Sequence, residues 1–304
     1  MTSERGHIRI ASRTSALAIR QVEEIQDAIE RQDCSIEIIP VNTQGDIDDR
    51  PFPEMDGQGF FVKAVQEALL HGEADLAVHS YKDLPSAQVF DLEVAAVPLR
   101  ADPRDALLVR PEQFKAEGDS LPLKLSARVG TSSARRKAQL LSLREDLELS
   151  EIRGNVPTRI DKLRNGDLDA IVVAAAALER LRYEPVDLKL ELLDPRIFVP
   201  APAQGALALE IRRNDYYMAS LLTELHDPSG YRAVAAERGL LAMLQGGCQV
   251  ALGAHATFNQ GLITLCAWYE GNSVVVEHPN SEGAAMLAYD ALGRPTPHST
   301  GEVK

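Results

Sequence analysis

Two patterns of apolar residues alternate along the first two thirds of the chain. Short apolar runs predict strands, and longer segments with apolar residues every three or four positions predict amphipathic helices. Residues 16–29 are of the second kind, with Val22, Ile25 and Ile29 on one helical face. The predicted strands are 8–11, 36–41, 75–79, 93–99, one around Val129, one ending at Arg153, 170–173 and 206–211. The predicted helices are 16–29, 59–70, 133–143, 156–164 and 176–181. This alternation predicts parallel or mixed sheets with both faces covered.

The pattern changes near Tyr231. One long helix is followed by three strand-like segments and a last helix, at 250–258, 262–268, 273–277 and 282–292. The short polar turns at 259–261 and 270–272 predict antiparallel hairpins. We therefore expect two α/β domains with mixed sheets and a smaller α+β domain with a three-stranded antiparallel sheet.

Composition narrows the class of protein. A length of 304 residues suits two or three domains of about 100–150 residues each. The net charge of −13 and the few aromatic residues argue against a nucleic-acid partner. The longest apolar run, 170–178, is too short to span a membrane, and the N-terminus shows no secretory signal. Three cysteines at unrelated spacings predict neither a disulfide framework nor a metal site, so we expect a cytoplasmic protein.

The basic residues are mostly arginine, 24 against 8 lysines. Three predicted strand-to-helix loops contain them: Arg13 with Ser15, GTSSARR at 130–136 and RGNVPTR at 153–159. Helix N-termini at the carboxyl ends of strands bind anions, so these loops predict a site for a ligand with several carboxylates or phosphates. Arginines in the first helical turn oppose the helix dipole, which predicts a negative group nearby. The alternative is that each arginine is ion-paired at the surface. No Walker or GxGxxG motif points to a nucleotide.

Two further segments hold candidate chemistry. In VHSYKDLPS, Asp83 follows a buried strand, where it could act as a general acid or base or stabilise a developing cation, with Lys82 beside it. The alternative is an aspartate that caps a turn. In LQGGCQV, Cys248 follows two glycines. A thiolate is a good nucleophile, but a lone cysteine beside a strand is also typical of a small buried residue, as we expect for Cys34 and Cys266.

These segments resemble the porphobilinogen deaminase family, also called hydroxymethylbilane synthase. The resemblance spans nearly the whole chain. Its blocks occur in order as IASRTSALA, NTQGD, FFVK, VHSYKDLPS, DPRDALLV, GTSSARR, RGNVPTR, PAQGALALEIR and GGCQV.

The resemblance implies a fold and a domain division. The first two domains are expected to resemble the lobes of periplasmic binding proteins, and the third to hold the cofactor cysteine. The implied boundaries are 1–102 with 205–225 for domain 1, which holds the catalytic aspartate loop, 103–204 for the arginine-rich domain 2 and 226–304 for domain 3.

The resemblance also implies an activity and a cofactor. The family deaminates porphobilinogen and joins four molecules head to tail on a dipyrromethane primer. The primer is attached through a thioether to the cysteine that is Cys248 here, and water then releases the linear tetrapyrrole. We expect a monomer that acts on a small molecule, with no nucleic acid and no membrane as partner.

Site residues follow by motif position. Asp83 matches the catalytic aspartate, with Lys82 beside it. The implied substrate contacts are Arg13, Ser15, Lys63, Ser80, Arg153, Arg159 and Arg180. The implied cofactor contacts are Lys82, Asp83, Thr131, Ser133, Arg135, Arg136 and Gln204.

The sequence departs from the family's usual residues at Gln58, Ala101, Ala177 and Ala251. None of them is an implied site residue, although Gln58 lies in a segment that resembles a flap. Two other classes remain open. One is a two-lobed anion-binding protein without catalysis. The other is a ligand-sensing regulator, which would need a helix-turn-helix and a basic face that the sequence does not show.

Overall fold

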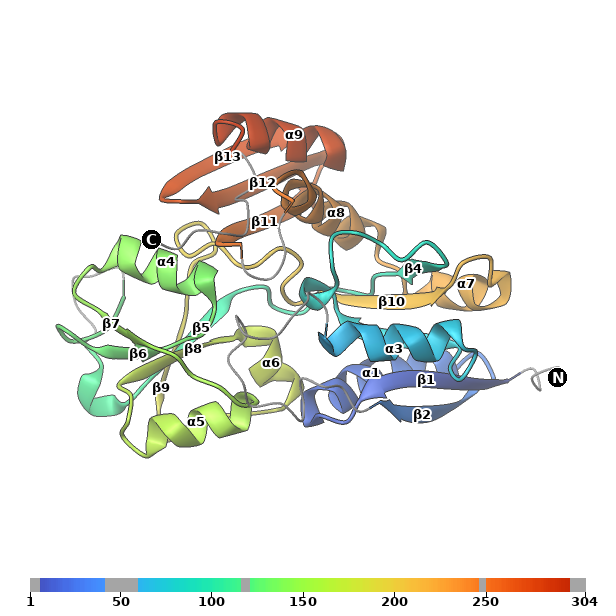
Figure 1. Cartoon of the computed structure of the whole chain (residues 1–304), viewed down its shortest axis with the longest axis horizontal. Coiled ribbons are helices and arrows are strands. Elements are labelled where there is room, and N and C mark those ends of the chain that lie inside the picture. The colour runs from blue at the N-terminus through green and yellow to red at the C-terminus, as the bar shows by residue number, and fades with distance from the viewer. Residues whose placement is uncertain (1–5, 42–59, 116–120, 246–249, 296–304) are drawn as a thin grey trace. The chain divides into compact units, whose positions relative to one another are not determined.

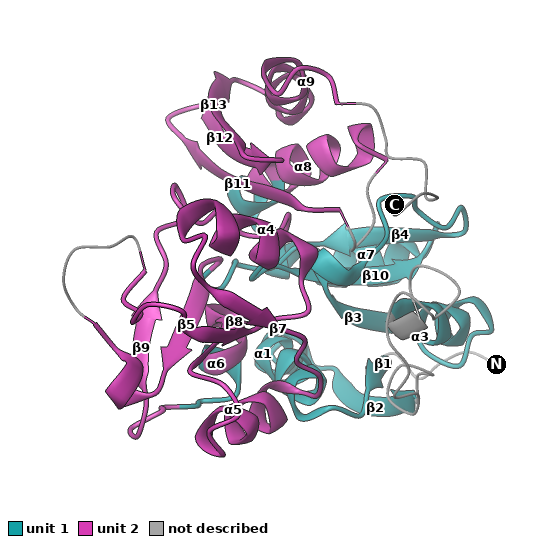
Figure 2. Cartoon of the chain, turned by 60° about the vertical axis from the view of Figure 1, so that its left-hand side comes forward, with its two compact units in different colours: residues 1–102, 179–183, 204–231 teal, residues 103–178, 184–203, 232–304 magenta. Residues whose placement is uncertain are grey.

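The computed structural model describes residues 6–41, 60–115, 121–245 and 250–295. The chain divides into two compact units that are both discontinuous in sequence (Figure 2). Unit 1 comprises residues 1–102, 179–183 and 204–231, and unit 2 comprises residues 103–178, 184–203 and 232–304.

Unit 1 is built on a mixed sheet of five strands, in the order β2-β1-β3-β10-β4. The strands are β1 (His7–Arg13), β2 (Ser35–Val41), β3 (Leu76–Ser80), β4 (Leu92–Ala96) and β10 (Leu207–Arg212). β1 runs parallel to β2 and β3, whereas β10 is antiparallel to both β3 and β4. β10 therefore enters the sheet between β3 and β4, which precede it by more than a hundred residues (Figure 2, with β10 and β4 also labelled in Figure 1).

Helices cover both faces of this sheet. α1 (Ala16–Glu30) and α7 (Tyr216–Leu222) pack on one face, where Val22, Ile25 and Leu222 join the strand residues in one core. α3 (Phe60–Leu70) packs on the other face through residues such as Val65 and Leu69. This division follows from the alternation of side chains along each strand.

Unit 2 contains a second mixed sheet with the order β7-β6-β8-β5-β9. Its strands are β5 (Asp105–Val109), β6 (Arg128–Gly130), β7 (Glu148–Ser150), β8 (Ala170–Ala174) and β9 (Lys189–Leu192). β6 is parallel to β7 and β8, and β5 is antiparallel to β8 and β9. The two five-stranded sheets thus share one pattern, in which three parallel strands are followed by two antiparallel pairings. The accompanying helices are α4 (Ala134–Leu143), α5 (Val156–Arg164) and α6 (Ala175–Arg180), whose last two residues belong to unit 1.

A three-stranded antiparallel sheet also belongs to unit 2. Its strands are β11 (Leu252–Asn259), β12 (Leu262–Tyr269) and β13 (Asn272–His278), packed against α8 (Pro228–Met243) and α9 (Ser281–Ala291). Both connecting turns have two central residues with positive φ, such as Gln260 at 49° and Gly261 at 84°. Such turns match the twist of a hairpin, and the two predicted hairpins are confirmed.

The fold class predicted from the sequence is confirmed, with several differences in detail. β4 ends at Ala96 rather than residue 99, because the amide of Val97 donates to Nδ1 of His226 and the following Pro98 has no N–H for the ladder. β7 ends at Ser150, so Arg153 lies in the following loop. β5, β9 and α7 were not predicted as separate elements. The domain boundaries implied by the family resemblance stay a prediction.

Candidate active site

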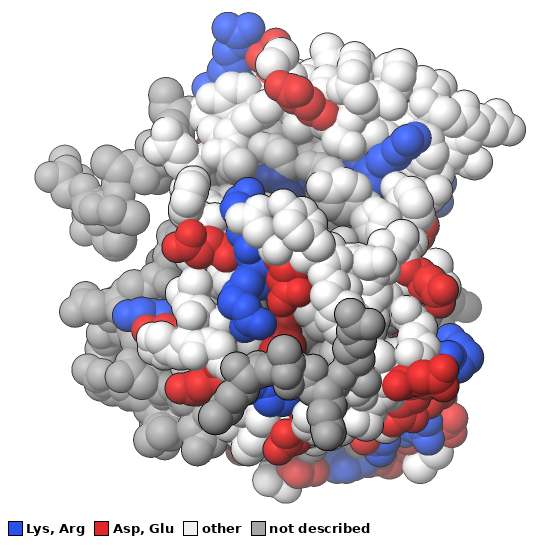
Figure 3. Space-filling view, turned by 90° about the vertical axis from the view of Figure 1, so that its right-hand side faces the viewer, with Lys and Arg blue, Asp and Glu red and all other residues white. Residues whose placement is uncertain are grey.

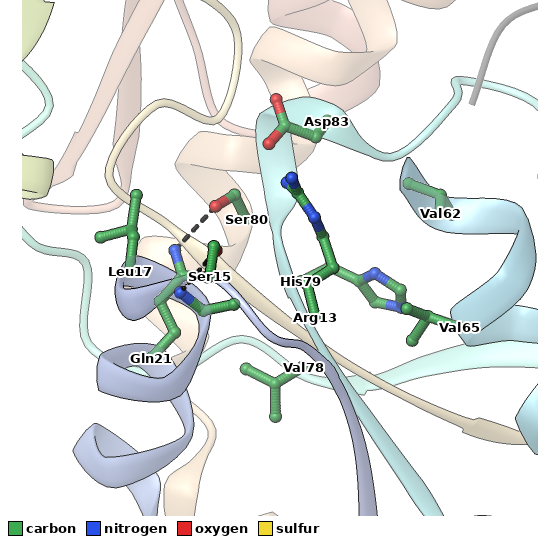
Figure 4. Close-up of a pocket in the computed structure, with 11 residues that line it drawn as sticks. Arg13, Ser15, Leu17, Gln21, Val62, Val65, Val78, His79, Ser80 and Asp83 are labelled. Atoms are coloured by element: carbon green, nitrogen blue, oxygen red, sulfur yellow. Dashed lines mark hydrogen bonds between the residues drawn. The ribbon is translucent and has the colours of Figure 1, made fainter. Parts of the chain in front are cut away.

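A pocket opens in unit 1 at the carboxyl ends of β1 and β3 (Figure 4). Ligands of open α/β sheets bind at this edge, where helix N-termini begin. Polar side chains and a set of apolar ones line it together. The lining residues are Arg13, Ser15, Leu17, Ala18, Gln21, Val62, Val65, Val78, His79, Ser80 and Asp83.

The backbone places the polar residues of the pocket directly. Arg13 is the last residue of β1, and Ser15 caps α1 by accepting a hydrogen bond from the amide of Ala18 at 3.3 Å. Ser80 is the last residue of β3, and Asp83 ends the short 3-10 turn Tyr81–Asp83 that follows. Because β1 and β3 are parallel neighbours, both ends meet at one edge. Of the predicted site residues, the structure thus brings Arg13, Ser15, Ser80 and Asp83 together.

The guanidinium group of Arg13 points toward the carboxylate of Asp83 (Figure 4). Lys82 turns to another partner, since its Nζ donates to Oε1 of Gln204 at 3.4 Å. Gln204 is buried, and its backbone carbonyl accepts a hydrogen bond from Nε of Arg100 at 2.8 Å. A carboxylate beside a guanidinium at a strand end can accept hydrogen bonds from N–H groups or stabilise a positive charge.

Gln21 is a pocket residue that was not predicted from the sequence. Its side chain is buried on α1, and Nε2 donates to Oγ of Ser80 at 2.7 Å. With its oxygen accepting from Gln21, the Ser80 hydroxyl can direct its own hydrogen toward an acceptor in the pocket. A signal existed: Gln21 lies among Ala18, Val22 and Ile25 on the apolar side of α1, where a polar residue needs a buried partner.

A second buried group, the Glu210 network, lies on the side of the sheet that α3 covers. Nε2 of His79 lies 3.0 Å from Oε2 of Glu210, and Gln66 on α3 donates from Nε2 to Oε1 of Glu210 at 2.9 Å. The side chains of His79 and Glu210 are only 5% and 6% exposed. His79 was not predicted as a site residue, although it lies inside the VHSYKDLPS block and lines the pocket.

Two predicted substrate residues of unit 1 have other partners. Nε of Arg180 donates to Glu24 at 2.7 Å, and its Nη2 donates to the carbonyl of Gly205 at 2.9 Å. Lys63 on α3 is 79% exposed and lies 3.8 Å from Glu67, one turn along the helix. On the face drawn in Figure 3, Lys and Arg side chains lie beside Asp and Glu side chains.

In unit 2, the two arginines that open α4 share one buried carboxylate. Asp105 is fully buried on β5. It accepts from Nη1 of Arg135 at 2.8 Å and from Nε and Nη2 of Arg136 at 2.9 and 2.6 Å. The two guanidinium groups hold the pKa of Asp105 well below its usual range, although burial alone would raise it. This is the negative group that the arginines in the first turn of α4 predicted. One carboxylate against two guanidinium groups still leaves one positive charge.

That charge belongs to a cationic cluster of Arg136, Arg153 and Arg159. Burial lowers the pKa of Arg159, and the positive charges of Arg136 and Arg153 lower it further. Nε of Arg159 donates to the carbonyl of Gly154 at 2.8 Å. Mutual repulsion of this kind is relieved when an anion binds. The cluster lies at the N-terminal ends of α4 and α5, where the helix dipoles also favour an anion.

The caps of α4 and α5 are built from the predicted loops. Ser133 caps α4 by accepting from the amide of Arg136 at 3.4 Å, and buried Thr131 accepts from the amide of Ser133 at 3.3 Å. Asn155 caps α5 by accepting from the amide of Thr158. Cys248 and Gln58 lie outside the described residues.

The sheets and the strand-end clusters described above define an α/β protein whose positive groups could bind an anionic ligand. Comparisons with known proteins agree. A family model described as porphobilinogen deaminase, dipyromethane cofactor binding domain, matches residues 8–220, and the model of the C-terminal domain of the same family matches residues 231–270. The chain belongs to the porphobilinogen deaminase family. The predictions of a transferase of tetrapyrrole biosynthesis and of a dipyrromethane cofactor are confirmed at this level.

Curated relatives are named porphobilinogen deaminase as well. The porphobilinogen deaminase of Syntrophobacter fumaroxidans is 43% identical over 261 residues, covering 85% of this chain and 82% of the relative. That of Roseiflexus castenholzii is 46% identical over 255 residues, covering 83% of this chain and 82% of the relative.

Likeness to solved structures of other proteins is weaker. An ancestral arginine-binding protein covers 73% of this chain at 13% identity and a TM-score of 0.41, with 92% of its own length matched. An amino-acid transporter's substrate-binding protein from Streptococcus pneumoniae covers 73% of this chain at 13% identity and a TM-score of 0.40, with 87% of its own length matched. The fold assignment rests on the sheets described above. Within the described ranges, no helix is both long and apolar enough to cross a bilayer.

Proposed function

We propose that this chain deaminates porphobilinogen and joins four molecules of it into linear hydroxymethylbilane, with the site residues assigned by motif in their family roles. The observation that supports this most is the pocket of unit 1, in which Arg13, Ser15, Ser80 and Asp83 line one wall at the strand ends. A pocket with both a carboxylate and a guanidinium suits a substrate that has carboxylates and passes through a cation.

Asp83 is the proposed catalytic group. When ammonia leaves the aminomethyl carbon of porphobilinogen, the pyrrole becomes a cationic electrophile. A carboxylate in a partly apolar pocket stabilises such a cation more strongly than water does. Val62, Val65 and Val78, which also line the pocket, supply that lower dielectric. Asp83 can then accept the proton that the newly bonded pyrrole carbon releases.

The arginines and the hydroxyl groups that cap helices are proposed to bind the carboxylates of the substrate. Arg13 and Ser15 lie where the dipole of α1 adds positive potential. Arg153 and Arg159 provide the same in unit 2, and Arg180 and Lys63 are proposed substrate contacts that would exchange Glu24 and Glu67 for the ligand.

The residues of unit 2 fit a group with carboxylate side chains. The group of Asp105, Arg135 and Arg136 has a net charge of one positive unit. Nε of Arg135 is buried without a hydrogen-bond partner among the described residues. Thr131, Ser133, Arg135 and Arg136 are therefore proposed to hold the dipyrromethane, together with Lys82, Asp83 and Gln204 in unit 1. When bound through Cys248, the dipyrromethane supplies the pyrrole carbon that starts the chain.

The activity is tested by incubating the purified chain with porphobilinogen and measuring released ammonia and oxidised porphyrin product. We expect Asp83→Asn to lose at least about a hundredfold in turnover, because a single electrostatic stabiliser is worth that much. Asp91→Asn removes an exposed carboxylate of the same unit and is expected to leave turnover unchanged. Binding of porphobilinogen without ammonia release by the unaltered chain would instead identify the anion-binding class.

The cofactor is tested by intact-protein mass. We expect the unaltered chain and Cys34→Ser to show a mass excess of one dipyrromethane, and Cys248→Ser to show none. An excess that persists in Cys248→Ser would place the attachment elsewhere.

We also propose a monomer in the cytoplasm. Cys34 and Cys266 are unpaired and buried, which suits a reducing compartment. Light scattering during gel filtration tests the oligomeric state, and a mass of 33.2 kDa is the expected result.

A further inference from the structure

His79 and Glu210 form a buried pair, and His79 is one of the residues that line the pocket. Paired Ala11 and Ala77 fix the register of β1 and β3, and Arg13 and His79 each come two residues later on their strands. Arg13 and His79 therefore project from the same face of the sheet as near neighbours, and both line the pocket (Figure 4).

Charged groups of both signs lie near His79. Glu210 on β10 lies 3.0 Å away, Arg13 lies on β1, and Lys82 and Asp83 follow on the next turn. From α3 the neutral amide of Gln66 contacts Glu210, while Lys63 and Glu67 on the same helix are exposed. Glu210 is thus the buried negative charge behind Arg13, and His79 lies between Glu210 and the pocket.

The chemistry of the pair follows from this placement. A protonated imidazole donates Nε2–H to Glu210 and cancels its charge. Without a protonated His79, the buried carboxylate of Glu210 would be uncompensated. It would then weaken the positive potential that Arg13 offers an anionic ligand, because little solvent is present to screen the charge of Glu210.

We propose that His79 is a positioning residue that neutralises Glu210 and thereby maintains the affinity of the pocket for its carboxylate-bearing substrate. This inference rests on the proposed function. It assigns to His79 and Glu210 an effect on KM, and none on the chemical step that Asp83 serves.

The experiment measures kcat and KM for porphobilinogen in His79→Gln, Glu210→Gln and the double variant. We expect His79→Gln to raise KM on the order of tenfold, because one uncompensated charge is left near the ligand, with kcat within about twofold. Glu210→Gln removes the negative charge and, with it, the anion that holds the extra proton on His79, so the site stays neutral. Its KM is therefore expected within about twofold of that of the unaltered chain. The double variant is neutral and is expected to recover the KM that His79→Gln loses.

A purely structural hydrogen bond predicts another pattern. Both single variants would then be impaired alike, and the double variant would not recover. That result, or a fall in kcat that matches the rise in KM, would overturn the proposal. If His79→Gln fails to fold, His79→Asn leaves Glu210 uncompensated in the same way and takes its place in the comparison.

The chain contains a matched control on the same sheet. His7 and Glu37 pair at 3.1 Å near the N-terminal ends of β1 and β2, whereas the pocket lies at the carboxyl ends of β1 and β3. Their side chains are 46% and 54% exposed. His7→Gln and Glu37→Gln are expected to change neither constant. If the unaltered chain did not turn over porphobilinogen at all, the proposed function would fail first. Normal turnover of the unaltered chain without the expected KM pattern would remove the inference alone.

Discussion

Replacing Asp105 with asparagine tests the ion pairs that hold the start of α4. Asp105 is fully buried and accepts three charge-assisted hydrogen bonds from Arg135 and Arg136. Asparagine offers one acceptor oxygen and turns an N–H donor toward a guanidinium donor. Two buried positive charges then remain uncompensated. Removing one partner of a buried pair costs about 3–5 kcal/mol of unfolding free energy, a large part of a typical total of about 5–15 kcal/mol.

Urea unfolding followed by tryptophan fluorescence measures this loss. The chain has one tryptophan, Trp268. It packs with Val199 and Ala138, and the carbonyl of Val199 accepts a hydrogen bond from Arg135. The fluorescence therefore reports on the region that changes. With a urea slope of about 2–3 kcal/mol/M, the midpoint is expected to fall by roughly 1–2 M.

The control is the Arg164–Asp187 pair of the same unit, which has similar bonds of 2.7 and 2.8 Å but side chains 39% and 46% exposed. Asp187→Asn is expected to lose at most about 1 kcal/mol, because solvent screens exposed pairs. Equal losses in Asp105→Asn and Asp187→Asn would refute the argument that burial makes the Asp105 pair costly to break.

The same pair predicts a pH dependence. The folded pKa of Asp105 lies below that of an unfolded aspartate, about 3.9. Its contribution is therefore fully present above about pH 4 and is lost as the pH falls through the folded pKa. We expect the stability difference between the unaltered chain and Asp105→Asn to be constant from pH 5 to 7 and to shrink in stronger acid. A difference that grows on acidification would contradict this sign.

Two further changes have matched controls. Gly205→Ala should lower the melting temperature more than Gly72→Ala. Both glycines have positive φ, but a Cβ at Gly205 would lie 2.5 Å from the carbonyl oxygen of Ala101, whereas a Cβ at Gly72 would have nothing within 4 Å. Equal shifts would show that only the backbone angle matters. Gln21→Leu should raise KM for porphobilinogen by about three- to tenfold, because Ser80 loses the donor that orients its hydroxyl. Gln26→Leu, on the same helix but outside the pocket, should leave KM unchanged. An unchanged KM in Gln21→Leu would exclude this role for Gln21.

Sequence patterns predicted most of the helices and strands because these elements bury one regular face. β9 was not predicted because it is only four residues long. Leu190 and Leu192 alternate with charged residues, but all four residues are exposed, so the alternation marks no buried face. α7 was not predicted because its buried face is short, with Met218, Leu221 and Leu222. The exposed Tyr216 and Tyr217 at its start add large side chains outside that face, so the sequence shows no clear helical period.

The candidate site was predictable where function depends on the ends of elements. Arg13, Ser15, Ser80 and Asp83 all lie at strand or helix ends, which periodicity locates. The partners of the arginines were not predictable in this way. Asp105 precedes Arg135 by thirty residues, and their contact requires β5 to pair with β8 in a register that the local pattern does not specify.

The position of β10 has a consequence for biosynthesis. The ribosome makes β1 to β3 early, yet the neighbour that seals the edge of β3 is translated only at residues 207–212, after the second sheet of five strands has been made. Until then β3 keeps an open edge, which is a template for wrong pairing. The nascent chain must therefore hold its first sheet unfinished through more than a hundred further codons, and chaperone protection should matter most in that interval.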